Sequence, residues 1–181
     1  GTLVLTRLEE HLKTQELGKL VKPGTFYDFT RYRPTVMYIE ERRIIITPNT
    51  TINYAKRDPE PDLLFFHILE PHACAEDYSD AVLELFKTFR VKRYCRVGGM
   101  YDAVPHTRPI LVTGSLSGKP IDVKTGEVRA PQAPYQGPTT ILNLISEGAE
   151  KLGIESMTLM AHLPQYVQLE EDYSGSTGLL E

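Results

Sequence analysis

An apolar run, an amphipathic helix and a second apolar run follow one another between residues 63 and 97. The first run, LLFFHIL at 63–69, is continuously apolar except for His67, which is typical of a strand buried on both faces. Residues 75–90 carry apolar side chains at helical spacing, and 94–97 is a short β-favouring run. A strand, helix and strand in this order form a right-handed crossover between parallel neighbours. The sequence therefore predicts an α/β fold with a mixed, mostly parallel sheet.

The length and charge of the chain exclude several classes of protein. Its 181 residues are the usual size of one domain with its own core, and a formal net charge of −4 gives no general field for nucleic acid. Its apolar runs are too short to span a membrane. Cys74 and Cys95 lack the close spacing of a metal or redox pair, and no basic and apolar leader opens the chain. We therefore expect a cytoplasmic protein without a metal, cofactor, nucleic-acid or membrane partner.

Local patterns predict further helices and strands. Leucines at helical spacing predict a helix over residues 2–17, and two β-favouring runs on either side of residues 40–42 predict a hairpin. The other predicted elements are strands at 110–116 and 156–161, a long polar loop at 117–135 with a turn at 124–127, a helix at 141–152 that Gly153 ends, and the start of a last helix at 174–181.

A double glycine and a polar loop follow the second strand of the crossover. We expect Gly98 and Gly99 to end the strand at 94–97, because paired glycines can take positive φ and allow a backbone or ligand to approach closely. In open α/β sheets ligands gather beyond the carboxyl ends of strands, where this loop would place His106 and Arg108. An imidazole and a permanent cation can bind an anion there, or they can fix the loop to its neighbours.

Two other strand ends carry polar side chains to the same expected edge. Glu70 and His72 follow the first apolar run, and His162 follows the last predicted strand. If the strands align as in a doubly wound sheet, Glu70 and His72 approach His106. The sequence then predicts a carboxylate and imidazole cluster at this edge.

Gly137, Pro138 and Thr139 precede the helix predicted at 141–152. Proline fits the first turn of a helix, and the unpaired amide groups beyond it can receive an anion. The alternative is that these residues cap the helix and bind nothing.

The segment 26–34, FYDFTRYRP, combines aromatic and arginine side chains and is too irregular for a helix. Rigid aromatics and arginines are common in interface hot spots, so the segment can anchor a partner surface. Alternatively, it covers its own core, with Asp28 paired to Arg31 or Arg33. The residues of the interface hypothesis are Tyr27, Asp28, Phe29, Arg31, Tyr32 and Arg33.

Four stretches together resemble the proteasome assembly chaperone 2 family. The stretch VGGMYDAVPHTRPILVTG is similar to the family's strand, glycine pair and PHTRP loop, and FYDFTRYRP, EPH at 70–72 and YQGPT at 135–139 agree with it in the family's order. The resemblance is closest to the bacterial branch. It implies a three-layer α/β/α sandwich similar to the phosphorylase/hydrolase-like fold. It also implies one domain over 1–181 that lacks the family's first strand and C-terminal helices.

The resemblance implies a protein-binding module that catalyses no reaction and assembles as a homo-oligomer, with a trimer as one form. Archaeal relatives carry a terminal docking signature, hydrophobic-Tyr-any, whereas this chain ends in GLLE, so that contact is not carried over. The alternative is a small-molecule enzyme or sensor whose site consists of Glu70, His72, His106 and Arg108. This alternative includes ATP-grasp activity, because some relatives carry an ATP-grasp label. The sequence contains no GxxxxGK[ST] phosphate loop, no HExxH zinc pair and no GxSxG nucleophile elbow.

Overall fold

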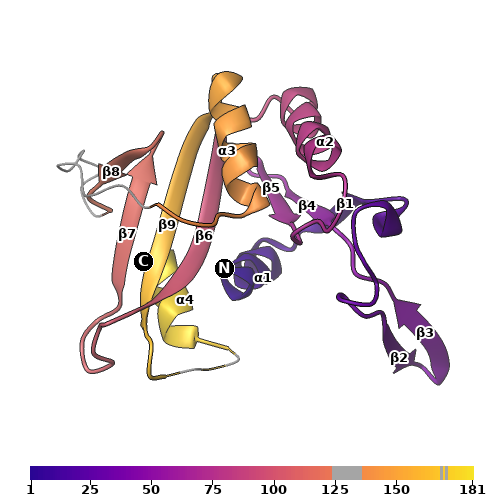
Figure 1. Cartoon of the computed structure of the whole chain (residues 1–181), viewed down its shortest axis with the longest axis horizontal. Helices are drawn as coiled ribbons and strands as arrows, with labels where there is room; N and C mark the ends of the chain where they lie inside the picture. The colour runs from indigo at the N-terminus through magenta and orange to yellow at the C-terminus, as the bar shows by residue number, and fades with distance from the viewer. Residues whose placement is uncertain (124–135, 168, 170) are drawn as a thin grey trace. The chain divides into compact units, whose positions relative to one another are not determined.

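The computed structural model (Figure 1) describes residues 1–123, 136–167, 169 and 171–181. Its contacts group the chain into two units. The first unit consists of residues 1–8 and 83–181, and the second of residues 9–82. Each unit contains its own sheet. Among the described residues, no helix is long and apolar enough to cross a bilayer.

A four-stranded mixed sheet forms the centre of the first unit. Its strands are β6 (Arg93–Asp102), β7 (Leu111–Leu116), β8 (Lys119–Ile121) and β9 (Glu155–Pro164), in the order β6-β9-β7-β8. β6 and β9 run parallel over their whole lengths, from Arg93 opposite Glu155 to Asp102 opposite Pro164. β7 pairs antiparallel with both β9 and β8.

Two helices of the first unit pack against this sheet (Figure 1). They are α3 (Ile141–Lys151) and α4 (Tyr173–Leu180). The Ser156 hydroxyl of β9 forms a hydrogen bond with Ser146 of α3. Leu163 lies an odd number of residues further along β9, so its side chain points to the other face, where it contacts Gly175 of α4. The α3 contact and the α4 contact are therefore on opposite faces of the sheet.

The second unit contains an antiparallel sheet and a separate hairpin. The sheet consists of β1 (Gln15–Lys19), β4 (Thr51–Ala55) and β5 (Leu63–His67) in the order β1-β4-β5, and the hairpin of β2 (Thr35–Ile39) and β3 (Arg42–Ile46). A 3-10 turn, η1 (Pro23–Thr25), follows β1. Helices α1 (Thr2–Leu12) and α2 (Ala75–Thr88) each have residues in both units. The buried side chains of the second unit include Ile52, Phe65, Tyr78 and Val82.

Several sequence predictions are confirmed. The chain has a mixed α/β fold, the hairpin forms on either side of a Glu40-Glu41 turn, and α2 occupies the predicted segment. The strand predicted at 110–116 is β7, and the last predicted helix is α4. Gly153 follows α3 with a φ of +73°, which is the left-handed conformation expected of a residue that ends a helix.

The helix predicted over 2–17 is too long. α1 ends at Leu12, Lys13 adopts a positive φ of 51°, and β1 begins at Gln15. β1 and β4 were both missed, because their antiparallel pairing joins segments more than thirty residues apart. The spacing of apolar residues within one segment does not indicate which distant segment that segment pairs with.

Gly98 and Gly99 do not end a strand, contrary to the prediction. β6 continues through both glycines to Asp102, and His162 likewise lies within β9 rather than after it. The glycines serve close packing instead. A Cβ atom on Gly98 would lie 3.0 Å from Sδ of Met160, and one on Gly99 would lie 3.1 Å from Cδ1 of Leu163.

The predicted parallel pairing across the crossover joins β5 and β6, which belong to different units, and it stays a prediction. β5 is hydrogen-bonded to β4 and runs antiparallel to it, whereas β6 pairs with β9. Among the ladders of the described residues, β6–β9 alone is parallel, so a mostly parallel sheet is not confirmed. Part of the predicted loop at 117–135 forms β8, and the predicted turn at 124–127 lies outside the described residues.

Candidate functional site

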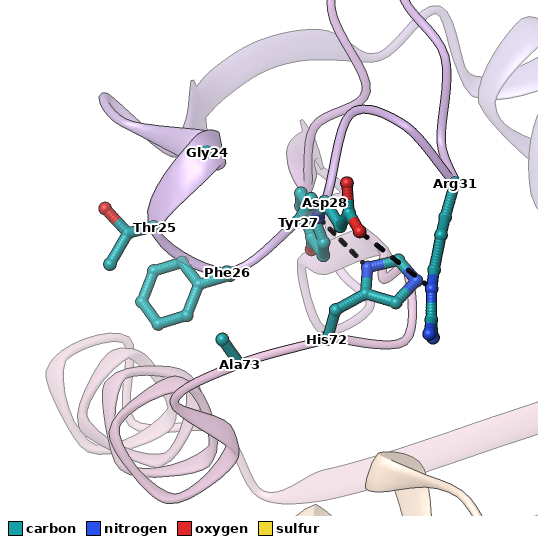
Figure 2. Close-up of a pocket in the computed structure, with 8 residues that line it drawn as sticks. All are labelled: Gly24, Thr25, Phe26, Tyr27, Asp28, Arg31, His72 and Ala73. Carbon is teal, nitrogen blue, oxygen red and sulfur yellow. Dashed lines mark hydrogen bonds and ion pairs between the residues drawn. The ribbon is translucent and has the colours of Figure 1, made fainter.

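A pocket of about 290 Å³ lies in the second unit, between the aromatic segment 26–34 and the residues that follow β5 (Figure 2). An imidazole, a guanidinium and a carboxylate are among its polar groups. The residues that line it are Gly24, Thr25, Phe26, Tyr27, Asp28, Arg31, His72 and Ala73.

His72 is attached to the aromatic segment by both its backbone and its ring. Its amide donates to the Phe26 carbonyl at 2.8 Å, and the Asp28 amide donates to its Nδ1 at 3.2 Å. Nδ1 is therefore an acceptor, so the neutral ring carries its proton on Nε2. The Tyr32 ring packs against the imidazole with a centroid distance of 4.6 Å. The sequence prediction placed His72 at a sheet edge, and the structure places it against the aromatic segment.

The Asp28 carboxylate is held in its charged form. The hydroxyl and the amide of Thr30 donate to its Oδ1 at 2.7 and 2.8 Å. These hydrogen bonds, with a smaller contribution from nearby Arg31, lower the pKa of Asp28 below its ordinary value. Nε of Arg31 lies 3.9 Å from Oδ2 of Asp28, which is the pairing that the structural alternative predicted. The pocket thus presents a carboxylate and a guanidinium beside the His72 imidazole.

Tyr27 connects this segment to the core. Its side chain is 2 % exposed, and its hydroxyl hydrogen-bonds Thr50 and lies 3.1 Å from the Tyr78 hydroxyl. Thr50 and Tyr78 are themselves joined at 2.5 Å. Tyr27 therefore anchors the segment from inside and offers no contact area to a partner. Of the other predicted interface residues, Asp28, Arg31 and Arg33 are exposed, whereas Phe29 and Tyr32 are half-buried.

The hairpin that follows the aromatic segment exposes large apolar side chains. Tyr38 is 70 % exposed, Ile45 57 % and Ile39 53 %. The sequence predicted the hairpin but assigned no role to its surface. The signal was present in TVMYI and RRIII, because neither run alternates between apolar and polar residues as a half-buried strand does. The exposed apolar residues of the hairpin are Val36, Met37, Tyr38, Ile39, Ile45 and Ile46.

In the first unit, His162 joins the ends of three strands. Its Nδ1 lies 2.7 Å from Oδ2 of Asp102 on β6, and its Nε2 lies 2.9 Å from Oγ1 of Thr113 on β7. The His162 hydrogen bond and the Ala103 amide lower the pKa of Asp102. A carboxylate that orients an imidazole beside a hydroxyl can move a proton, and it can equally hold three strands in register.

The loop residue His106 has a partner in the first unit that the sequence did not indicate. Its Nδ1 lies 2.9 Å from the Tyr166 hydroxyl, which also accepts the His106 amide at 2.8 Å. Arg108 is exposed on the same loop. Glu70 and His72 belong to the second unit and His106 to the first, so their predicted approach stays a prediction.

The predicted anion site precedes α3. The helix begins at Ile141 with Thr140 as its N-cap residue, so Pro138 lies outside the first turn rather than in it. Thr139 accepts a hydrogen bond from Asn143, which also accepts one from Arg96. Anion binding by Gly137, Pro138 and Thr139 stays a prediction. Tyr135, from the YQGPT motif, lies outside the described residues. Within the described part of the chain, no group of three or more His, Cys, Asp or Glu side chains could hold a metal ion.

Comparison with known proteins gives the chain a family and a fold. A family model described as the PAC2 family matches residues 1–181. No curated protein matches the chain. A PAC2 family protein from Streptomyces avermitilis is 23% identical with a TM-score of 0.85, and the match covers 99% of this chain and 75% of that one.

Two further solved structures have names that refer to the proteasome. A proteasome-assembly chaperone homologue from Mycobacterium tuberculosis is 19% identical with a TM-score of 0.83, over 99% of this chain and 75% of that one. The archaeal proteasome activator PbaB from Pyrococcus furiosus is 14% identical with a TM-score of 0.70, over 98% of this chain and 74% of that one. At these identities the likeness shows a shared fold.

Proposed function

The chain belongs to the PAC2 family, and from this premise we propose that it acts, like a proteasome-assembly chaperone, by binding other proteins and without catalysing a reaction. The observation that carries the proposal is the exposed apolar surface of the β2–β3 hairpin. We also propose that the protein works as a homo-oligomer, for which a trimer is one candidate form.

An isolated two-stranded hairpin is at best marginally stable in water. This one places large apolar side chains on both faces, since Met37 and Ile39 point to one side and Tyr38 and Ile45 to the other. Contiguous exposed apolar side chains on a small domain mark interaction surfaces. The aromatic segment, which precedes the hairpin in the chain, exposes Arg31 and Arg33, a residue type that is enriched at interfaces.

The proposal also covers the number of domains, the layers of the fold and the location of the protein in the cell. Residues 1–181 form one domain, a three-layer α/β/α sandwich of the phosphorylase/hydrolase-like kind. The contacts of α3 and α4 with opposite faces of the first unit's sheet support the layering. The protein acts in the cytoplasm, which the free thiols of Cys74 and Cys95 support.

The test is capture of partners by the purified full chain from a lysate of its source organism, quantified by mass spectrometry. The variant combines Tyr38→Ser, Ile39→Thr and Ile45→Thr. We expect it to lose a specific set of partners at least about tenfold, since truncating even one hot-spot side chain costs more than about 1.4 kcal/mol.

The matched control removes three exposed apolar side chains from the first unit, which are 54 %, 49 % and 41 % exposed, through Tyr101→Ser, Leu144→Thr and Leu152→Thr. It should retain the partners. Equal capture by the native chain and the hairpin variant, with circular dichroism showing that both are folded, would reject the hairpin as the binding surface.

A small-molecule enzyme or sensor is the second candidate, and the hydrogen-bonded chain Asp102–His162–Thr113 favours it. A thermal-shift screen with nucleotides, phosphate and small esters separates the two candidates. A ligand that stabilises the native chain but not His162→Gln would support the second one.

A further inference from the structure

Arg96 of β6 is a half-buried arginine whose hydrogen-bond partners are all neutral. Its Nε and Nη2 atoms donate to Oγ1 of Thr158 on β9 at 3.2 and 2.8 Å, and its Nη1 atom donates to Oδ1 of Asn143 on α3. Arg93, on the same strand, pairs with the Glu155 carboxylate. Among the described residues, no carboxylate forms an ion pair with Arg96.

The guanidinium of Arg96 has more donors than its neighbours use. A guanidinium has five N–H groups and is charged at every pH that a folded protein meets. The three hydrogen bonds occupy three of these groups, so two have no acceptor in the described part of the chain. Burying a charge costs free energy unless an opposite charge compensates it, and neutral oxygens replace only part of the lost hydration. Arg96 is therefore held in place with its charge uncompensated.

The side chains beside Arg96 on the sheet supply further donors. Oγ1 of Thr158 already accepts two N–H groups, which leaves its hydroxyl proton for another acceptor. Ser115 of β7 stands opposite Thr158 in the next ladder, so its side chain lies on the same face. Within the ranges that the structure describes, its hydroxyl has no hydrogen-bond partner. Arg96, Thr158 and Ser115 thus form a half-buried row with a surplus of donors, which we call the Arg96 row.

α3 fixes the guanidinium from the other side. A guanidinium can only donate, so Asn143 must direct its Oδ1 atom to Arg96, and its Nδ2 atom then donates to Oγ1 of Thr139. The amide holds the guanidinium without neutralising it. Because these hydrogen bonds exist before any ligand binds, a ligand of Arg96 would lose little free energy in ordering the site.

We infer that the Arg96 row binds a small oxyanion, the phosphate or carboxylate group of a small molecule, with Arg96 as its charged anchor. The planar fork of arginine matches both groups, and the hydroxyl protons of the row add hydrogen bonds that carry no charge of their own. The three side chains are half-buried on the face that α3 covers, so the occupant is a small anion rather than a protein surface.

This inference goes beyond the proposed function, which concerns a hairpin in the second unit and requires no small molecule. It also differs from the anion site that the sequence predicted before α3. In the Arg96 row the charge comes from β6, and Thr139 contributes only by holding Asn143.

The test is isothermal titration calorimetry of the full chain with inorganic phosphate, adenosine monophosphate and succinate, at an ionic strength held constant with chloride. At least one of them should bind saturably, and comparing the three distinguishes free phosphate, a phosphate ester and a carboxylate. Arg96→Met should weaken this binding at least about tenfold, and Thr158→Val, which keeps the charge and the shape, about tenfold. Arg93→Met removes the same charge from the same strand and should bind as the native chain does, because Glu155 already pairs with Arg93.

Three results would overturn the inference. They are no saturable binding of any of the three anions, equal affinity of the native chain and Arg96→Met, and an equal loss in Arg93→Met, which would indicate a general effect of charge. Circular dichroism checks that each variant is folded. If Arg96→Met is not, Arg96→Lys takes its place, since lysine keeps the charge, lacks the fork and should also weaken binding.

Partner capture by the hairpin variant is a separate readout. If that variant loses its partners and no anion binds the native chain, the proposed function stands and the Arg96 row is not a binding site. If Arg96→Met loses the anion and captures the native set of partners, the two properties are independent.

Discussion

At the residue scale, His162 shows why an ionisable group is informative only together with its neighbours. The sequence placed it after a predicted strand, at the same expected edge as His72 and His106. In the structure both of its ring nitrogens have partners, the Asp102 carboxylate and the Thr113 hydroxyl. With a side chain 12 % exposed, the imidazole is a fixed connection between three strands of one sheet.

The first prediction concerns the pH dependence that Asp102 gives the protein. Its folded-state pKa is lowered, first by the His162 hydrogen bond, so it lies below the unfolded value of about 3.9. The charged carboxylate therefore stabilises the fold above the unfolded pKa, and this contribution is lost as the pH falls through the folded pKa. The difference in unfolding free energy between the native chain and Asp102→Asn should shrink as the pH falls below about 4.

Urea denaturation at a series of pH values measures this difference. Asp80→Asn, which removes an exposed carboxylate from α2, is the matched control. If the difference for Asp102→Asn does not change with pH, or changes as the control does, the His162 contact does not stabilise the carboxylate.

At the element scale, helix propensity and packing favour different residues at Gly148 of α3. Helix propensity favours alanine, whereas packing favours glycine. A Cβ atom there would overlap Cδ1 of Leu83, so alanine would force that side chain to move. Alanine in a helix interior gains up to about 1 kcal/mol over glycine, whereas overpacking costs about 1–3 kcal/mol. We expect Gly148→Ala to destabilise the native chain by about 1 kcal/mol.

A double-mutant cycle with Leu83→Ala isolates the clash. In that background the packing conflict is gone and the propensity gain remains, so Gly148→Ala should become stabilising. Thermal or urea unfolding of the four chains gives the result. The same sign of effect in both backgrounds would show that the contact with Leu83 does not decide the choice of glycine.

The elements that the sequence predicted well are those with a local signal. α2 and the hairpin each follow from the spacing of apolar residues and from the polar residues between them. β1 has the polar sequence QELGK and is mostly exposed, so only its pairing with β4 makes it a strand. Gly98 and Gly99 have the composition of a strand end, yet their close packing against Met160 and Leu163 keeps them within β6.

The sequence indicated which types of residue form the candidate site, but it did not indicate which of them lie together in the structure. The aromatic segment was recognised, but Tyr27 is buried with Thr50 and Tyr78, which come from distant parts of the chain. His72 follows a strand, as expected, yet its ring contacts Asp28 rather than another strand end. The tertiary contacts that decide which side chains stay exposed involve residues 23 to 51 positions apart, and spacing alone does not encode them.

At the scale of the whole molecule, the question is whether residues 1–181 unfold as one domain. The family model spans the whole chain, whereas contacts group the residues into two units. The unit boundaries fall within α1 and α2, between Leu8 and Glu9 and between Val82 and Leu83. Unfolding either unit alone would break a helix whose remaining residues belong to the other, and a broken helix leaves unpaired backbone groups. We therefore predict a single cooperative transition.

The prediction is tested with one core truncation in each unit. Phe65→Ala in β5 and Ile145→Ala in α3 remove buried side chains, 5 % and 0 % exposed, and each should cost about 2–5 kcal/mol. Because one transition has one free energy, hydrogen exchange in both units should accelerate equally in either variant. If Phe65→Ala accelerated exchange in residues 9–82 while 83–181 kept the native rate, the chain would consist of two domains.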